Sequence, residues 1–304
     1  SLNESVKRPQ NATRIAIIGG GLAGLTAAYD LLRTTQQPVS VTIYEAGTQL
    51  GGLAAGFKGR TTWDWPLEHF YHHLFTNDDA ILGLTRELGM GDRLQTHRPT
   101  TVIHYQGRNY PFDSPLRLLL FPGLRLVDRL RMGLVLAYLK YHPRPPWQHF
   151  DKLLADQWLQ RWIGEAGYDV IWRPMLQGKF GSHYQEVNLA WFWARIYKRT
   201  PSLVYYTGGF QAFVDGLAAK LQGDNVTLQT GMAVERIARI AEGRWQVMAM
   251  NQAPADYDLV LSTVSPSLMQ RLAPDLPASY LAQLGALKSM GAVVLTVALD
   301  RKLM

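Results

Sequence analysis

The stretch IAIIGGGLAGLTAAYDLL, residues 15–32, decides the fold of this chain. Its first four residues are apolar and, with the Arg before them, predict a buried strand over residues 14–18. After a run of glycines, apolar residues return at helical spacing and predict a helix over residues 22–33. The stretch is therefore expected to fold as a strand, a glycine turn and a helix.

Three glycines in this stretch, Gly19, Gly21 and Gly24, match the pattern G-x-G-x-x-G. The first glycine of this pattern permits a tight turn, the second lets backbone approach a pyrophosphate, and the third lets the helix pack against the strand. Leu22 and Ala23 begin the helix, where backbone N–H groups and the positive end of the helix dipole favour phosphate oxygens. The turn is therefore predicted to hold the pyrophosphate of a dinucleotide.

An acidic residue completes this fingerprint. Residues 39–45 (VSVTIYE) predict a second strand that ends at Glu45, 21 positions after Gly24. A strand, a helix and a strand in about 30 residues imply parallel pairing with a right-handed crossover. Glu45 would accept hydrogen bonds from the ribose hydroxyls of an adenosine, and its charge would repel a 2′-phosphate. This residue therefore argues against NADP at the site.

The composition limits the class of protein. The chain has 304 residues, of which 47% are hydrophobic and 18% charged, an ordinary globular composition and long enough for two domains. It has no cysteine, which excludes disulfides, thiolate metal sites and a cysteine nucleophile. The formal net charge is +7, but Arg and Lys are scattered without a basic run. We therefore expect a solvated basic surface and no nucleic-acid partner.

A glycine pair after the second strand distinguishes between the remaining dinucleotides. Gly51 and Gly52 stand six and seven residues beyond Glu45 and give the pattern E-x5-G-G. This pattern resembles that of the flavoprotein family that includes flavin amine oxidases, protoporphyrinogen oxidases, carotenoid desaturases and UDP-galactopyranose mutases. The resemblance implies FAD in an extended shape, with Ala46 and the glycine pair close to the cofactor. Many relatives carry Arg directly after the pair, whereas Leu53 stands there in this chain.

The resemblance continues along the chain in the family's order. Residues 61–75 (TTWDWPLEHFYHHLF) fall where the family's chain runs beside the flavin ring, and residues 208–221 resemble the helix that follows a Gly-Gly pair. In MAVERI, residues 232–237, the resemblance implies that the backbone of Val234 contacts the adenine. Residues 258–268 (DLVLSTVSPSL) resemble the returning strand D-x-V-h-x-T-x-P. A further FAD motif near the family's C-terminus is missing, so we expect the chain to be C-terminally incomplete.

Three histidines, His69, His72 and His73, lie in the segment EHFYHHLFTND. Their spacing allows a shared metal, but no Cys, Asp or Glu pattern completes a ligand set, and we expect no metal. A purely structural role in a loop is a second interpretation. The matching segment of UDP-galactopyranose mutases reads roughly H-h-h-H, and this resemblance implies that His69 and Phe70 lie against the flavin ring. His69 is then also a candidate for proton transfer, because histidine titrates near neutral pH.

The segment between the two α/β parts is rich in Leu, Trp and Arg and predicts helices over residues 114–200. Residues 117–141 predict two helices, because Pro122 and Gly123 interrupt them. These helices either belong to the core with Arg on the wet face or lie on a membrane surface. The aromatic residues here either form the core or line the pocket of a large, flat or apolar substrate. Lys179 is a candidate cation of such a pocket.

A further strand is predicted over residues 291–300 (GAVVLTVALD). Amine oxidases generally carry a Lys in the corresponding strand, where it holds a water at the reactive nitrogen of the flavin. Leu295 stands at that position in our alignment. This departure argues against a simple monoamine oxidase.

Together these features predict an α/β fold, in which a discontinuous Rossmann-like FAD-binding domain carries an inserted, mostly helical α+β substrate domain. The FAD-binding domain is assigned to residues 1–75 and 203–270. The substrate domain is assigned to residues 76–202 and 271–304 and is expected to be incomplete.

The resemblance implies an FAD-dependent oxidoreductase of the protoporphyrinogen oxidase and amine oxidase type, which oxidises a C–N or C–C bond by hydride transfer to the flavin. The alternatives are a UDP-galactopyranose mutase-like flavin isomerase, a carotenoid desaturase-like enzyme and a non-catalytic dinucleotide-binding module. We expect a small-molecule substrate, large or apolar, and a cytoplasmic protein, with peripheral membrane association as an option. His69 and Lys179 are the candidates for catalysis, and the sequence does not indicate the oligomeric state.

Overall fold

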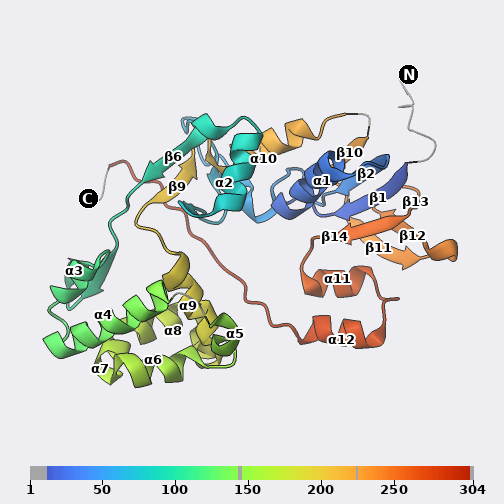
Figure 1. Cartoon of the computed structure of the whole chain (residues 1–304). Helices are drawn as coiled ribbons and strands as arrows, with labels where there is room; N and C mark the ends of the chain where they lie inside the picture. Colours follow the sequence, from blue (N-terminus) through green and yellow to red (C-terminus); the bar gives the residue numbers. More distant parts are fainter. Residues whose placement is uncertain (1–11, 143–145, 224, 302–304) are drawn as a thin grey trace. The chain divides into compact units, whose positions relative to one another are not determined.

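The computed structural model describes residues 12–142, 146–223 and 225–301 (Figure 1). These residues divide into two compact units, which we describe separately. The first unit consists of the described residues within Ser1–His73, Ala80–Gln95 and Tyr205–Met304, and the second of those within Leu74–Asp79 and Thr96–Val204. The assignment of cofactor and substrate binding to separate domains stays a prediction.

The first unit is built on a parallel sheet. β1 (Thr13–Ile18) pairs in parallel with β2 (Val39–Tyr44), and α1 (Leu22–Thr34) connects the two strands. β10 (Val226–Gln229) and β14 (Leu259–Ser262) extend the sheet to the order β10–β2–β1–β14. Every residue of β2 is buried, as expected for a parallel strand covered on both faces. The predicted strand–helix–strand unit and the mixed α/β class are confirmed.

The parallel sheet is covered by elements from distant parts of the chain. Ala16, Ile18 and Tyr44 share a buried cluster with residues of an antiparallel sheet and of the helix that follows β14. In this cluster the hydroxyl groups of Tyr44 and Tyr257 are hydrogen-bonded at 2.7 Å. The covering elements are β11 (Val234–Arg239), β12 (Trp245–Ala249), β13 (Ala255–Tyr257) and α11 (Pro266–Leu272). α1 contacts β1, β2 and α10 (Gly209–Lys220).

Shorter elements complete the connections. β3 (Gly56–Phe57) pairs antiparallel with β4 (Leu67–Glu68), and a sheet of order β5–β9–β6 consists of β5 (Leu74–Phe75), β9 (Leu203–Tyr206) and β6 (Leu94–His97). Two further helices are α2 (Asp79–Glu87) and α12 (Ala278–Ala286).

The strand predicted over residues 291–300 is wrong. These residues form neither helix nor strand, and Val293 and Leu295 are largely exposed. A strand requires a neighbour whose backbone groups pair with its own, and within the described residues no strand pairs with this segment. Its apolar alternation is therefore not sufficient for regular structure.

The second unit contains the helices that the sequence predicts. Its core consists of apolar side chains from these helices and from the connection between α3 and α4, with Phe121, Met132, Leu159 and Phe192 almost completely buried. The helices are α3 (Pro115–Leu119), α4 (Leu126–Tyr141), α5 (Trp147–Phe150), α6 (Ala155–Ile163), α7 (Glu165–Gly167), α8 (Arg173–Phe180) and α9 (Leu189–Lys198). None of the helices in the described ranges is both long and apolar enough to cross a membrane.

A hairpin precedes these helices. β7 (Val102–Tyr105) pairs with β8 (Arg108–Pro111) across a two-residue turn. Gln106 and Gly107 have φ of 49° and 77°, and positive φ at both central residues is the geometry that matches the twist of a tight hairpin.

Candidate dinucleotide-binding site

Two glycine loops meet at the end of the parallel sheet. Gly51 donates its backbone N–H to the carbonyl oxygen of Gly20 at 2.9 Å, and Gly21 and Gly51 form a parallel bridge. A Cβ built on Gly52 would lie 3.1 Å from the Cα of Gly21. The turn after β1 and the loop after β2 are therefore in backbone contact, although about 30 residues separate them in a strand–helix–strand unit.

The positions of the fingerprint are occupied by glycine for different physical reasons. A Cβ on Gly24 would lie 2.0 Å from the carbonyl oxygen of Gly19, so the third glycine allows the helix to pack. Gly19 has φ of 112°, and a Cβ there would lie 2.5 Å from the Oγ1 of Thr263. Both positions therefore require glycine for the fold itself.

Gly21 is different, because the protein does not require glycine there. Its φ of −76° and ψ of −180° suit any residue. Apart from its chain neighbours, the described atom closest to a Cβ on Gly21 would be the Cα of Gly52, at 3.7 Å, an ordinary contact distance. A side chain would instead cover the backbone at the start of α1. The turn therefore fits a ligand that approaches this backbone closely, such as a pyrophosphate.

The start of α1 provides a favourable field for an anion. α1 begins at Leu22, directly after Gly21, and its first regular bond is from the N–H of Leu25 to the carbonyl of Gly21, at 3.0 Å. The preceding N–H groups, including those of Leu22 and Ala23, come before the intrahelical ladder. The first turn contains no acidic residue, so the positive end of the helix dipole is not neutralised there.

Glu45 is oriented by the backbone of both loops. Its Oε2 accepts a hydrogen bond from the N–H of Gly20 at 2.8 Å, and its Oε1 accepts one from the N–H of Gly47 at 2.7 Å. A carboxylate has about four acceptor positions, so each oxygen can accept a further donor. Glu45 is therefore held in a fixed orientation and retains the capacity to accept ribose hydroxyls.

The start of β11 lies beside Glu45. The N–H of Met232 donates to the backbone carbonyl of Glu45 at 2.8 Å, and the N–H of Gly231 donates to that of Gly47 at 2.7 Å. Val234 follows two residues later, at the first position of β11. The structure thus brings Val234, the predicted adenine contact, close to Glu45, the predicted ribose contact. Ala46, which lies between Glu45 and Gly47 in the loop, is exposed.

Gln211 on α10 holds the glycine-rich loop, a role that the sequence analysis missed. Its side-chain oxygen accepts from the N–H of Gly56 at 3.0 Å, and its side-chain nitrogen donates to the carbonyl of Leu50 at 3.4 Å and to Asp215 at 2.7 Å. Gln211 is buried, and its two neighbours on the loop flank the glycine pair. A polar residue directly after the Gly-Phe that opens α10 was the available signal.

Glu68 is a second buried polar residue that the sequence analysis missed. Its carboxylate accepts from the N–H of Phe210 at 2.7 Å and from the hydroxyl of Tyr205 at 2.9 Å. Burial raises the pKa of Tyr205, and the hydrogen bond to Glu68 raises it further. Because Phe210 is in the first turn of α10, the carboxylate also lies at the positive end of that helix. These bonds fix the position of Glu68, which directly precedes His69 in the chain.

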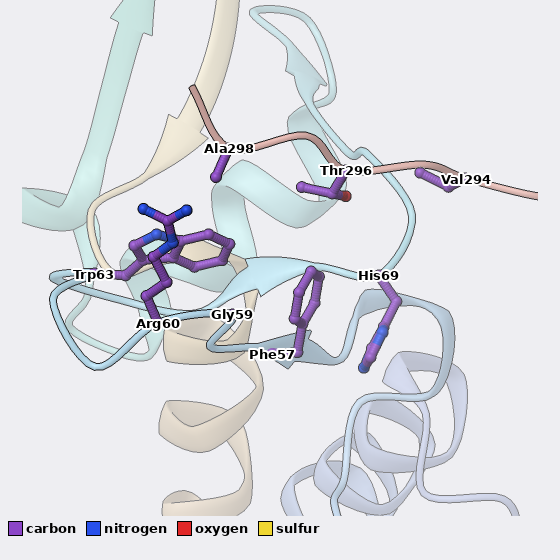
Figure 2. A pocket seen from close by; sticks show the side chains of 8 residues that line it. All are labelled: Phe57, Gly59, Arg60, Trp63, His69, Val294, Thr296 and Ala298. Carbon is purple, nitrogen blue, oxygen red and sulfur yellow. The ribbon is translucent and has the colours of Figure 1, made fainter. Parts of the chain in front are cut away.

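A pocket lies beside this segment within the first unit (Figure 2). Its volume is about 350 Å³. The ring of Phe57 stacks on His69, with centroids 4.8 Å apart, and meets Trp63 edge to face at 5.8 Å. Figure 2 shows residues 294–298 running along the other side of the pocket. The lining residues are Phe57, Gly59, Arg60, Trp63, His69, Val294, Thr296 and Ala298.

The pocket is joined to the glycine loops through the backbone. The N–H of Ala55 donates to the carbonyl of Gly52 at 3.1 Å, and the N–H of His69 donates to the carbonyl of Ala55 at 3.2 Å. Phe70 is half-buried, and its carbonyl is hydrogen-bonded to the Nδ1 of His72. The described residues contain no group of three or more His, Asp and Glu that could hold a metal.

Two other predicted residues are exposed. Leu53, directly after the glycine pair, is 71% exposed. Lys179 lies in the second unit, where its ammonium group is 5.9 Å from the ring centre of Trp191. The catalytic role of Lys179 stays a prediction.

Comparison with known proteins identifies the family. Residues 22–304 match the model of the family described as flavin containing amine oxidoreductase. A flavin-containing amine oxidase of Danio rerio is 23% identical over 290 residues, which cover 88% of this chain and 53% of that protein.

Solved structures share the fold at low identity. An oxidoreductase from Methanosarcina mazei has a TM-score of 0.68 and 17% identity, with 90% of this chain and 65% of that chain covered. Reduced UDP-galactopyranose mutase has a TM-score of 0.65 and 17% identity, with 90% and 60% covered. The chain thus spans less than two thirds of the length of each of these proteins. Because the family model covers almost the whole chain, the chain belongs to the flavin containing amine oxidoreductase family, whose cofactor is FAD.

Proposed function

We propose that this chain binds FAD across the two glycine loops and belongs to an enzyme that oxidises a C–N or C–C bond of a small molecule. The pyrophosphate is held by the turn around Gly21 and the start of α1, and the ribose by Glu45. The residues assigned to the cofactor are Gly19, Gly21, Leu22, Ala23, Gly24, Glu45, Ala46, Gly51, Gly52, Leu53, His69, Phe70 and Val234.

The observation that carries this proposal is the geometry of Gly21. The fold tolerates a side chain there, because a Cβ would be 3.7 Å or more from the nearest described atoms other than its chain neighbours. A glycine that the fold does not need supports a role in binding. The bridge from Gly21 to Gly51 supports the same site, because it places the second glycine loop against the first.

The pocket of Figure 2 is the proposed location of the chemistry. FAD, when bound, accepts a hydride equivalent from the substrate. The aromatic side chains of Phe57, Trp63 and His69 suit a flat or apolar group of the substrate. Arg60 provides a positive charge for a polar substituent of the substrate. His69, the candidate for proton transfer, lines the same pocket.

A flavin isomerase similar to UDP-galactopyranose mutase is the second candidate. The observation that favours it is the position of His69, which lines the pocket and corresponds to the first histidine of the mutase-like segment. Such an enzyme would need reduced FAD and would produce no net oxidation. The two functions therefore differ in the redox state of the cofactor that supports turnover.

An anaerobic substrate screen of the FAD-loaded, full-length protein tests the proposal. Amines, porphyrinogens and polyunsaturated apolar compounds are added to the oxidised protein, and the visible flavin absorbance is followed. We expect one class to bleach the flavin, and Phe57→Ala to slow this reaction without loss of FAD. If no class bleaches the flavin but dithionite-reduced protein converts a nucleotide sugar, the isomerase is correct. A protein that cannot be loaded with FAD would contradict both.

A further inference from the structure

The outer face of α4 in the second unit is apolar. Val127, Leu130, Leu134, Tyr138 and Tyr141 are all exposed, and Leu134 and Tyr141 are 74% and 78% exposed. At 3.6 residues per turn these positions fall within an arc of roughly 80° along the helix. The core is filled by other residues of α4, such as the fully buried Met132 and Leu139. The exposed stripe is therefore additional to the face that packs in the core.

Neighbouring elements extend this stripe into a larger surface. Leu116 in α3 and Leu120 directly after it are 63% and 61% exposed. Trp147 of α5 and Trp162 of α6 are each about half exposed. A solvent-exposed surface rarely carries so many large apolar side chains on adjacent elements unless they bind something. We call the exposed apolar residues named above the apolar surface: Leu116, Leu120, Val127, Leu130, Leu134, Tyr138, Tyr141, Trp147 and Trp162.

A pocket lies next to the stripe on α4. It is lined by Leu134, Tyr138 and Trp162 of the apolar surface, together with Val135, His149, Phe150 and Trp158. Its volume is about 510 Å³. The lining is almost entirely apolar and aromatic, so the pocket suits a hydrocarbon chain better than a polar group.

The charges within this part of the chain are almost all positive. Residues 115–142 contain five basic residues, Arg117, Arg125, Arg129, Arg131 and Lys140, and one acidic residue, Asp128. Asp128 is buried and paired with Arg125 at 2.9 Å, so it contributes little negative charge to the surface. Arg117 is exposed. Outside this range, Asp113, Asp151 and Glu165 are exposed acidic residues. Within α3 and α4 the exposed charge is basic and complements an anionic surface.

We propose that the apolar surface docks this protein on a lipid bilayer that contains anionic lipids. Leu and Val side chains enter the acyl boundary, and Arg side chains meet the anionic headgroups. Tyr138, Tyr141, Trp147 and Trp162 are of the residue types that favour the interface, because their rings have an apolar body and a polar tip. A protein partner explains the apolar stripe but not the combination of interfacial aromatic residues, an excess of basic residues on α3 and α4, and a hydrocarbon-sized pocket.

Vesicle flotation of the FAD-loaded, full-length protein tests this proposal. Vesicles of phosphatidylcholine alone are compared with vesicles that also contain phosphatidylglycerol, at low and high salt. We expect binding to the anionic vesicles that weakens with salt. Leu134→Glu should weaken binding at least about tenfold, the loss of one buried Leu side chain. Arg117→Gln should weaken it about fivefold, the effect of one basic residue near an anionic surface.

Leu287→Glu is the matched control, because Leu287 is 61% exposed but lies after α12 in the first unit. It should bind vesicles like the unchanged protein. Urea unfolding should be the same for all three variants, since each altered side chain is exposed. Absence of vesicle binding, or equal weakening by Leu134→Glu and Leu287→Glu, would overturn the proposal. The proposal would also fail if the unchanged protein did not bind vesicles and Leu134→Glu dissociated an oligomer, as measured by light scattering.

Discussion

The glycine turn gives the sharpest test, the substitution Gly21→Ala. The extended backbone at this position, with φ of −76° and ψ of −180°, is open to alanine. The new Cβ would make ordinary contacts of 3.7 to 3.9 Å with Gly51 and Gly52. A Gly-to-Ala change at a compatible position stabilises a protein by about 0.4–1 kcal/mol, because the unfolded chain loses freedom. The apoprotein should therefore be as stable as the unchanged protein, or slightly more stable.

The cofactor should respond in the opposite direction. The methyl group that Gly21→Ala adds covers backbone that we assign to the FAD pyrophosphate, so at least one charge-assisted hydrogen bond is lost. Such a bond contributes about 1.5–3 kcal/mol. The Kd for FAD should therefore rise roughly 10- to 150-fold. Stability and affinity thus change in opposite directions, which a general loss of structure cannot reproduce.

Gly24→Ala is the matched control, in the same turn and with the same added methyl group. Its Cβ would lie 2.0 Å from the carbonyl oxygen of Gly19, so the apoprotein itself should lose stability, by about 1–3 kcal/mol or more. Urea unfolding of the two apoproteins measures stability, and quenching of flavin fluorescence during titration measures FAD affinity. If Gly21→Ala binds FAD as tightly as the unchanged protein, the cofactor phosphates do not lie at this turn.

Three further substitutions test the surrounding site. Glu45→Gln retains one acceptor oxygen for the loop N–H groups but removes the charge, and should weaken FAD binding about tenfold in the same titration, the loss of one hydrogen bond to a charged group; unchanged affinity would contradict the ribose contact. Leu53→Arg adds a cation at a residue that is 71% exposed and should tighten FAD binding by a similar factor; weaker binding would place the phosphates elsewhere. Glu68→Gln keeps an acceptor oxygen for the N–H of Phe210 but removes the negative charge at the start of α10, and should destabilise the apoprotein by about 0.3–1 kcal/mol in urea; equal stability would mean that this charge contributes nothing.

Much of the secondary structure was predictable, because its signals are local. The apolar run before Gly19 and the helical spacing after it set β1 and α1, whereas the hydrogen bond between Gly20 and Glu45 is seen only in the structure. The interruption at Pro122 and Gly123 correctly separated α3 from α4. The predicted strand, helix and helix break each depend on residues within a few positions of one another.

Features that depend on distant neighbours were missed or wrong. Glu68 and Gln211 are ordinary polar residues in the sequence. Only the tertiary structure shows that both are buried, that Gln211 on α10 bonds the glycine-rich loop, and that Glu68 bonds the start of α10. The alternation in residues 291–300 satisfies the pattern of a strand, but pairing requires a second strand, and pattern alone does not provide one.

The sequence by itself determined the parallel α/β unit, the dinucleotide turn and, through Glu45 and the glycine pair, the preference for FAD. The tertiary structure decided which glycines the fold requires, Gly19 and Gly24, and that it does not require Gly21. It also decided that one stripe of α4 packs inward while a second apolar stripe faces outward. The physical reason is that periodicity reports the conformation of a short segment, whereas free space beside Gly21 and exposure of Leu134 depend on atoms many residues away.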